Sequence, residues 1–259
     1  MSRIGRRRGA LVQRAESDAR ALAIARARRG NLPQILARHL PNGFDYFNVG
    51  HSNLTARVFD ALRACAGQTH VLIHDVIPLT HPEFQRAGTV RAFRNKLEQV
   101  SAQADRVIFN SEDTRRTATG FMRDMGRVPP AIVAHLGLTP AKPDPGELPQ
   151  GLPPARPYFI TVGTIEPRKN HGFLLDLWAE MGADAPPLLI CGARGWNNTE
   201  VFARLDALPA GSPIRELPNL DDPALAALIQ GSAGMLFPSQ VEGFGLPPLE
   251  ALSLGTRVL

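Results

Sequence analysis

Short apolar runs alternate with amphipathic stretches along most of the chain. In its first half the apolar runs lie beside turn residues, and they predict strands at 46–49, 70–74, 106–110 and 131–135. The stretches between them predict helices at 54–66, 84–104 and 112–125, and Ser111 is a good N-cap for the last one. Such alternation is typical of βαβ units, whose strands form a parallel sheet.

The same alternation returns in the second half of the chain. Apolar runs there predict strands at 158–162, 188–191, 214–217 and 235–237. Helices are predicted at 172–181, 199–208 and 248–254, and one more is capped by Asp221 or Asp222 and opened by Pro223. Between the two halves, residues 139–157 contain seven prolines without periodicity, which predicts a stiff linker and a domain boundary.

Together these patterns predict an α/β protein with two Rossmann-like domains whose parallel sheets face a cleft. We expect a basic arm at 1–38, a first domain at 39–141, a proline-rich linker at 142–157 and a second domain at 158–259. Ligands of open α/β sheets bind beyond the carboxyl ends of the strands. The loops that follow the predicted strands are therefore the places to look for chemistry.

Composition narrows the class of protein. The 259 residues suffice for two domains with cores of their own. No apolar stretch reaches the ~18–20 residues of a membrane-spanning helix, and the N-terminus lacks a signal-peptide core, so a cytoplasmic location is expected. Cys65 and Cys191 lie far apart, without histidines at ligand spacing, which argues against a disulfide framework and against a zinc site.

Positive charge is concentrated in the predicted arm. The net charge is +5, yet ten of the 29 basic residues are arginines within positions 1–38, and the remaining residues hold 19 basic against 22 acidic groups. A solvated leader, partly disordered or helical, explains this arm. A surface for anionic membrane or nucleic acid is the alternative. The arm has no aromatic residue for base stacking, so no nucleic-acid partner is expected, while peripheral contact with a membrane stays open.

The most informative loop follows the predicted strand 235–237. Glu242 and Glu250 stand eight residues apart, with Gly243 and Gly245 between them and a predicted helix behind. Backbone amides at 243–246 and the helix N-terminus form a ready anion site. The two carboxylates could accept hydrogen bonds from two sugars while the amides hold phosphates. The alternative is a helix-capping loop with two solvated glutamates.

Basic side chains mark the loop after the predicted strand 158–162. Gly163 lets the chain turn, and Arg168 and Lys169 lie just before a helix. Cations at this place could neutralise a leaving diphosphate and supply the charge that a metal would otherwise provide. The alternative is a basic loop tip exposed to water.

Two further loops carry candidate residues. His74 follows a strand and could donate to a sugar hydroxyl with Asp75 orienting it, and His51 has the same position after its own strand. A structural role is an equal alternative for His74, and His81 and His171 are expected to be incidental. In the loop 191–198, Gly192, Gly195 and Trp196 could accommodate a nucleobase or simply pack together.

Several signals are missing from the sequence. It has no G-x-x-x-x-G-K-[ST] loop, no G-x-G-x-x-G fingerprint and no G-x-S-x-G elbow, so kinase, dehydrogenase and serine-hydrolase functions lose support. No Asp-x-Asp pair offers carboxylates to a divalent cation on a nucleotide.

The motifs IHDVIPL, NSEDTRRT, HLGL, VGTIEPRKN and FPSQVEGFGLPPLEAL together resemble glycosyltransferase family 4. That family comprises retaining nucleotide-sugar enzymes with the two-domain GT-B fold. The T-I-E-P-R-K-N variant is similar to the mannosyltransferase-like branch that makes surface polysaccharides, which points towards GDP-mannose.

The resemblance implies a role for each matching residue. Glu242 would contact the transferred sugar, Glu250 the nucleotide ribose, Lys169 the phosphates, and His74 the donor sugar. The amides of Gly243, Phe244, Gly245 and Leu246 would hold phosphate and sugar, beside Gly163 and Thr164. Many members carry arginine where this chain has Thr164, and Arg168 could compensate.

The implied reaction transfers a sugar from a nucleotide-diphosphate sugar to a saccharide or lipid-linked acceptor, with retention and without a required cofactor or metal. The acceptor would be met in the cytoplasm or at the inner face of the membrane. The family's first strand, and the elements that follow G-T-x-V in the family, have no counterpart in this sequence. This predicts an incomplete second domain and truncation at one or both ends. A non-catalytic fragment is therefore an alternative, and a binding protein that uses its basic arm is another.

Overall fold

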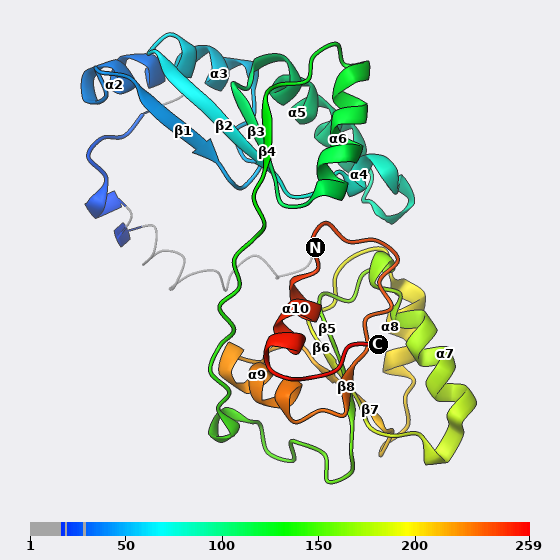
Figure 1. The fold of residues 1–259 in the computed structure, drawn as a ribbon. Helices are drawn as coiled ribbons and strands as arrows, with labels where there is room; N and C mark the ends of the chain where they lie inside the picture. The colour runs from blue at the N-terminus through cyan, green and yellow to red at the C-terminus, as the bar shows by residue number, and fades with distance from the viewer. Residues whose placement is uncertain (1–16, 19, 28–29) are drawn as a thin grey trace, which may run out of the picture.

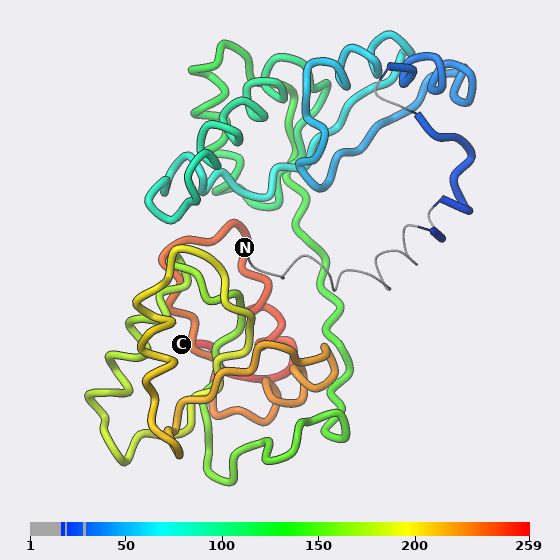
Figure 2. Tube along the Cα trace, turned by 180° about the vertical axis from the view of Figure 1, so that it is seen from behind, coloured from blue at the N-terminus to red at the C-terminus, as the bar shows by residue number. Residues whose placement is uncertain are grey.

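The computed structural model describes residues 17–18, 20–27 and 30–259. Two α/β domains lie one beyond the other and are joined by an extended stretch of chain, as Figures 1 and 2 show from opposite sides. Much of the predicted basic arm, namely residues 1–16, 19, 28 and 29, lies outside the described residues. The described part of the arm includes most of helix α2 (Leu32–His39), which has a proline in its first turn.

The first domain is built on a four-stranded parallel sheet of order β1-β2-β3-β4. Its strands are β1 (Phe44–Asn48), β2 (Gly67–Ile73), β3 (Arg106–Phe109) and β4 (Ala131–Val133). Helices α3 (Ala56–Arg63), α5 (Thr89–Gln103) and α6 (Glu112–Asp124) bury their apolar positions against it. Ser111 caps α6 as predicted, because its hydroxyl accepts a hydrogen bond from the amide of Thr114 at 3.1 Å.

The second domain has a parallel sheet of order β7-β6-β5-β8. Its strands are β5 (Phe159–Val162), β6 (Leu188–Cys191), β7 (Ile214–Leu217) and β8 (Gly234–Met235). Its helices are α7 (His171–Met181), α8 (Thr199–Asp206), α9 (Asp222–Gln230) and α10 (Leu246–Ser253). All four residues of β6 are buried, as expected of a parallel strand that is covered on both faces by separate apolar clusters.

The α/β class with two parallel sheets is confirmed, and two details differ from the predictions. The predicted helix 84–104 begins only at Thr89, because Gly88 before it has a left-handed φ of 82°. Ahead of it the chain forms two short turns of helix, α4 (Ile77–Thr80) and η1 (Pro82–Phe84). Of the predicted strand 235–237 only Met235 lies in a strand, the two-residue β8, and Met235 also pairs with Val258.

The proline-rich segment does more than span the two domains. After its extended part it forms the turn η2 (Pro145–Glu147) and packs on the second domain, where the amide of Asp144 donates to the carbonyl of Pro223 at 3.1 Å. Leu148 and Leu152 pack against the apolar cluster that includes α9. This part of the chain therefore belongs physically to the second domain.

Among the described residues, side-chain hydrogen bonds connect the domains at two places. Near η1, Trp196 Nε1 donates to the carbonyl of Phe84 at 3.0 Å, and Asn197 Nδ2 donates to the carbonyl of Gln85 at 3.0 Å. At the second contact, the carbonyl of Gly243 accepts hydrogen bonds of 3.4 Å from the hydroxyls of Ser111 and Thr114. Loops that follow β3 and β8 thus meet, as the carboxyl ends of open α/β sheets allow.

No helix within the described part of the chain is both long enough and apolar enough to cross a membrane.

Candidate active site

A cluster of four charged side chains lies where the loops after β5 and β8 meet. Lys169 Nζ lies 2.6 Å from Glu242 Oε1, and Arg168 Nη1 lies 2.7 Å from Glu242 Oε2. Arg168 Nε in turn lies 2.6 Å from Glu166 Oε1. Each oxygen of the Glu242 carboxylate therefore has its own cation, although the paired residues are 73 positions apart in the sequence.

Local backbone structure presents the two cations side by side. Pro167 opens the one-turn helix η3 (Pro167–Lys169), and Asn170 then adopts a left-handed φ of 54° before α7 begins. The amide of Gln240 donates to the carbonyl of Arg168 at 2.9 Å, and Arg168 Nη1 donates to the carbonyl of Val241 at 3.2 Å. The basic turn and the glycine loop are thereby fixed to each other by backbone as well as by charge.

Lys169 is largely enclosed, with 8% of its surface exposed. Its ammonium lies 5.1 Å from the centre of the Phe237 ring, a cation–π contact. A side chain at Gly163 would meet Lys169 Cε at 3.3 Å, so glycine there leaves room for the lysine stem. Enclosure in this way strengthens the attraction between the ammonium and any anion beside it.

Burial and the charges of the cluster together shift the pKa values of its two carboxyls in opposite directions. Burial alone would raise the pKa of Glu242, but its hydrogen bonds to Lys169 and Arg168 and their positive charges hold that pKa below its ordinary value. For Glu166, only 2% exposed, burial dominates over the attraction of Arg168 and Lys169 and raises the pKa. Glu242 is therefore a stable carboxylate near neutral pH.

The glycine loop lies directly against the first domain. A Cβ atom at Gly243 would lie 2.6 Å from the carbonyl oxygen of His74 and 2.9 Å from Asp75 Cβ, so only glycine fits this approach. Gly245 has a φ of 84° and precedes α10, which has proline in its first turn. Among the described residues, no acceptor binds the amides of 243–246, and an anion binding there stays a prediction.

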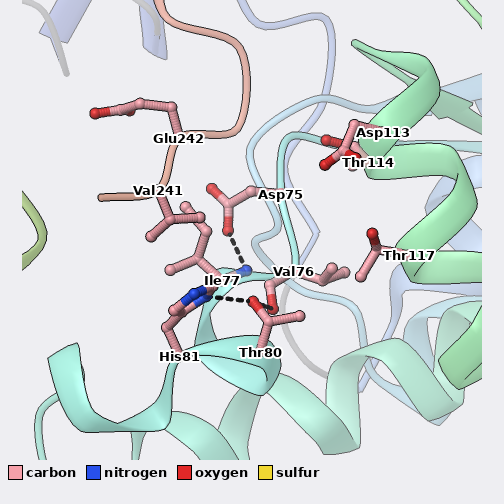
Figure 3. Close-up of a pocket in the computed structure, with 10 residues that line it drawn as sticks. All are labelled: Asp75, Val76, Ile77, Thr80, His81, Asp113, Thr114, Thr117, Val241 and Glu242. Carbon is pink, nitrogen blue, oxygen red and sulfur yellow. Dashed lines mark hydrogen bonds between the residues drawn. The ribbon is translucent and has the colours of Figure 1, made fainter. Parts of the chain in front are cut away.

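A cavity of about 120 Å³ lies between the domains beside this loop. Figure 3 shows Val241 and Glu242 on one side, Asp113, Thr114 and Thr117 of α6 on the opposite side, and Asp75 between them. The complete lining consists of Asp75, Val76, Ile77, Thr80, His81, Asp113, Thr114, Thr117, Val241 and Glu242. Hydroxyls and carboxylates from both domains therefore surround a space that is large enough for part of a polar ligand.

His51 and His74 of the first domain are each hydrogen-bonded to a backbone carbonyl. His74 Nε2 donates to the carbonyl of Val49 at 2.7 Å, and its ring lies 5.2 Å from the ring of His51 in an edge-to-face contact. Asp75 does not orient His74 as expected, because its Oδ1 accepts a hydrogen bond from the amide of Ile77 at 3.0 Å instead. His81 is expected from the sequence to be incidental. In the structure it instead lines the cavity and forms a hydrogen bond with the hydroxyl of Thr80.

Glu250 lies apart from the charge cluster. It lines a second cavity of about 180 Å³, together with Asp222 and residues 139–141 of the interdomain segment. Burial, and then the nearby charge of Asp222, raise the pKa of Glu250. Glu242 of the glycine loop and Glu250 of the helix behind it therefore line different cavities.

Thr164 and the loop 191–198 form one packed unit. A Cβ atom at Gly192 would lie 2.0 Å from the carbonyl oxygen of Gly163, and a Cβ at Gly195 would lie 2.7 Å from Thr164 Cγ2. Trp196 donates to Phe84 and lies under the guanidinium of Arg86 at 4.8 Å. Of the two alternatives for this loop, the structure favours packing over a nucleobase platform.

Two buried residues at this site are not among those that the sequence singles out. Glu166 lies in the E-P-R-K run. Its burial could have been suspected only from its place shortly after a buried strand. His171 is 2% exposed, and neither ring nitrogen has a partner among the described residues. Burial, and then the charge of Lys169, lower the pKa of His171 to about 4.

No group of three or more His, Cys, Asp and Glu side chains in the described part of the chain is arranged to hold a metal ion.

Comparison with known proteins gives a consistent set of relatives. The family "Glycosyl transferases group 1" matches residues 149–259. The serotype-specific mannosyltransferase WbdA of Escherichia coli is 32% identical over 225 residues, which is 77% of this chain and 27% of that protein. A D-inositol 3-phosphate glycosyltransferase of Mycolicibacterium paratuberculosis is 32% identical over 252 residues, 86% of this chain and 52% of that protein.

Solved structures share the fold at low sequence identity. The Anabaena protein Alr3699/HepE in complex with UDP has a TM-score of 0.65 and 16% identity, covering 89% of this chain and 62% of that one. A sucrose-phosphate synthase from Thermosynechococcus elongatus has a TM-score of 0.62 and 19% identity, covering 89% and 60%. The chain thus spans about a quarter of the mannosyltransferase relatives, whose matched share is 27%, and somewhat under two thirds of these structures.

Proposed function

We propose that the protein is a glycosyltransferase, because residues 149–259 match the family "Glycosyl transferases group 1" and the two parallel sheets match the GT-B fold of its structural neighbours. In this proposal it moves a sugar from a nucleotide-diphosphate sugar to a saccharide or lipid-linked acceptor. The observation that carries the proposal is the pairing of Lys169 and Arg168 with Glu242, beside backbone amides at the domain junction that have no acceptor among the described residues. Enclosed cations and amides are the groups that hold a diphosphate.

Each proposed contact follows from the position of the residue. Lys169, Arg168 and the amides of 243–246 hold the diphosphate, and Gly163 and Thr164 line the neighbouring turn. Glu242 accepts hydrogen bonds from hydroxyls of the transferred sugar, and Glu250 accepts them from the ribose in the second cavity. His74, whose Nε2 is engaged with Val49, contributes to the donor-sugar side of the cleft.

The proposed reaction retains the configuration at the anomeric carbon. The bond from that carbon to the diphosphate oxygen breaks, a bond to the acceptor oxygen forms on the same face, and the acceptor proton passes to the leaving diphosphate. Lys169 and Arg168 stabilise the negative charge that develops on the diphosphate, which is the task of preorganised electrostatic groups. The site residues supply this charge themselves, so no metal ion or cofactor is needed in the proposal.

GDP-mannose is the proposed donor. It is supported by the T-I-E-P-R-K-N run and by the identity of 32% to a mannosyltransferase over most of this chain. A lipid-linked or saccharide acceptor would be met in the cytoplasm, at the inner face of the membrane.

Transfer assays with purified protein test the proposal. GDP-mannose, UDP-glucose and ADP-glucose are each supplied, and release of the nucleoside diphosphate and formation of glycoside are measured. Lys169→Ala and Glu242→Ala each remove one member of the charge cluster, and each is expected to lower turnover by roughly 10²–10³-fold. Nuclear magnetic resonance of the product reports the anomeric configuration.

Lys142→Ala is the matched control, because it removes an exposed lysine of the interdomain segment. It should leave turnover unchanged, while circular dichroism shows that all three variants are folded. Normal turnover in both cluster variants would contradict the proposal.

A further inference from the structure

The carboxylate of Glu242 forms ion pairs with both cations of the proposed diphosphate site. Its Oε1 lies 2.6 Å from Lys169 Nζ and its Oε2 lies 2.7 Å from Arg168 Nη1. Without a bound ligand, therefore, an internal anion already neutralises the charges that a diphosphate would use. A diphosphate that binds to these cations has to take over the hydrogen bonds of the carboxylate.

This exchange places two anions next to each other in a partly buried site. Lys169 and Glu166 are buried, and Glu242 is about one fifth exposed at its side chain. A carboxylate that loses its cations in such surroundings is costly unless other donors replace them, and a like charge beside it adds to the cost. The hydroxyls of the sugar in an intact donor are such replacement donors, whereas a free nucleoside diphosphate has none at this position.

We propose that Glu242 is a specificity-determining residue that selects an intact nucleotide sugar over the free nucleoside diphosphate. The inference rests on the proposed function of this site. The intact donor gives Glu242 new partners, while the free diphosphate leaves it unpaired beside a negative charge. The same competition favours release of the diphosphate after the sugar has been transferred, because Glu242 then pairs again with Lys169 and Arg168.

The surrounding contacts allow the exchange without movement of the loops. Glu166 Oε1 holds Arg168 Nε at 2.6 Å, so Arg168 stays in place when Glu242 leaves its Nη1. The backbone bond from Gln240 to Arg168, and the bond from Arg168 to the carbonyl of Val241, do not involve the carboxylate. Rotation of the Glu242 side chain towards the interdomain cavity, which it already lines, is sufficient.

Calorimetric titration of the full chain tests the inference with three pairs of probes: GDP and GDP-mannose, UDP and UDP-glucose, ADP and ADP-glucose. The wild type should bind the intact donor of its preferred pair more tightly than the free diphosphate. Glu242→Gln keeps the size of the side chain but removes its charge. It should bind the free diphosphate about tenfold more tightly or better, and the ratio of the two Kd values should fall by a similar factor.

Glu180→Gln is the matched control, since it removes one exposed carboxylate of the same domain, and it should leave both Kd values unchanged. A Kd ratio in Glu242→Gln equal to that of the wild type overturns the inference alone. The inference is also overturned if the wild type binds the free diphosphate more tightly than the donor. That result does not depend on whether any variant folds. If the wild type binds none of the six probes, the proposed function fails and the inference with it.

Discussion

At the scale of the single residue, His171 shows how the charge cluster constrains its neighbours. It is the first residue of α7, it is buried, and its two ring nitrogens have no partner among the described residues. Lys169 lies two positions before it, and burial together with that charge lowers the pKa of His171 to about 4. The fold therefore holds this imidazole neutral at pH values at which an exposed histidine takes up a proton.

The consequence is a loss of stability in acid. Because the pKa of His171 is about 4 when folded and 6.5 ordinarily, its contribution is fully present above pH 6.5 and declines as the pH falls towards 4. His171→Leu removes this dependence and leaves no unpaired nitrogen, so it should be at least as stable as wild type at pH 7. Between pH 7 and pH 4, wild type should lose about 3 kcal/mol of unfolding free energy relative to the variant.

Urea denaturation at a series of pH values measures this difference, and His39→Gln, at an exposed position, serves as the control. An acid-side loss in His171→Leu as large as that of the wild type would refute the proposed cause.

Residue type and position predict part of the site. Lys169, Arg168, Glu242 and Glu250 are predicted from the sequence because they lie in the loops after predicted strands, or in the helix behind such a loop, and because the family resemblance assigns roles to the matching motifs. That Lys169 and Arg168 share one carboxylate cannot be read from the sequence, since the pairing depends on how two loops 73 positions apart are oriented. The contacts of Asp75 are missed for a similar reason, as its short side chain binds the nearest free amide, that of Ile77.

At the scale of the element, glycines decide how closely the loops beyond β5 and β6 approach each other. The amide of Gly163 donates to the carbonyl of Cys191 at 2.9 Å, and the two loops continue side by side. Glycine at 192 is required because any Cβ there would overlap the carbonyl of Gly163 at 2.0 Å. This contact between the two loops supports the basic turn that carries Lys169.

Gly192→Ala should accordingly destabilise the second domain. The added methyl group has no space and faces backbone, so a loss of about 3 kcal/mol or more of unfolding free energy is expected. Gly120→Ala provides the opposite case, because Gly120 lies inside α6 with nothing within 4 Å of an added Cβ. That variant should gain up to about 1 kcal/mol through helix propensity. Chemical denaturation of both variants measures the two changes, and a stable Gly192→Ala would show that the loops can separate.

Strands were the more predictable elements, because buried parallel strands are short apolar runs with clear ends. The bounds predicted for 188–191 and 214–217 coincide with β6 and β7. The predicted start of α5 is too early, because Gly88 adopts a left-handed conformation and the helix begins only after it, at Thr89. The helical turn α4, which lines the interdomain cavity, has only four residues and too little sequence for a periodic signal.

At the scale of the whole molecule, the cleft is held closed at two places. One is the glycine loop, where Gly243 meets the end of β2 and the start of α6. The other is the tryptophan contact, formed by Trp196 and Asn197 with the carbonyls of Phe84 and Gln85. Arg86 adds a cation–π interaction with the Trp196 ring at 4.8 Å. Residues of both domains line the cavity of the proposed site, so its shape depends on these contacts.

The double change Trp196→Phe and Asn197→Ala should loosen the closed arrangement while each domain stays folded. It removes two interdomain hydrogen bonds worth about 1 kcal/mol each, so the ratio of closed to open molecules should fall roughly 30-fold. Small-angle scattering should then report a larger radius of gyration. Hydrogen exchange should rise near residues 84–86 and 196–198.

Trp178→Phe is the matched control, because Trp178 is buried in the core of the second domain and donates to the carbonyl of Pro186. That change should lower the unfolding free energy without altering the radius of gyration of the folded protein. If the double variant scatters like the wild type, the contacts of Gly243 with Ser111, Thr114 and the β2 loop suffice to keep the cleft closed. The tryptophan contact would then order only the loop that carries it and would not fix the two domains relative to each other.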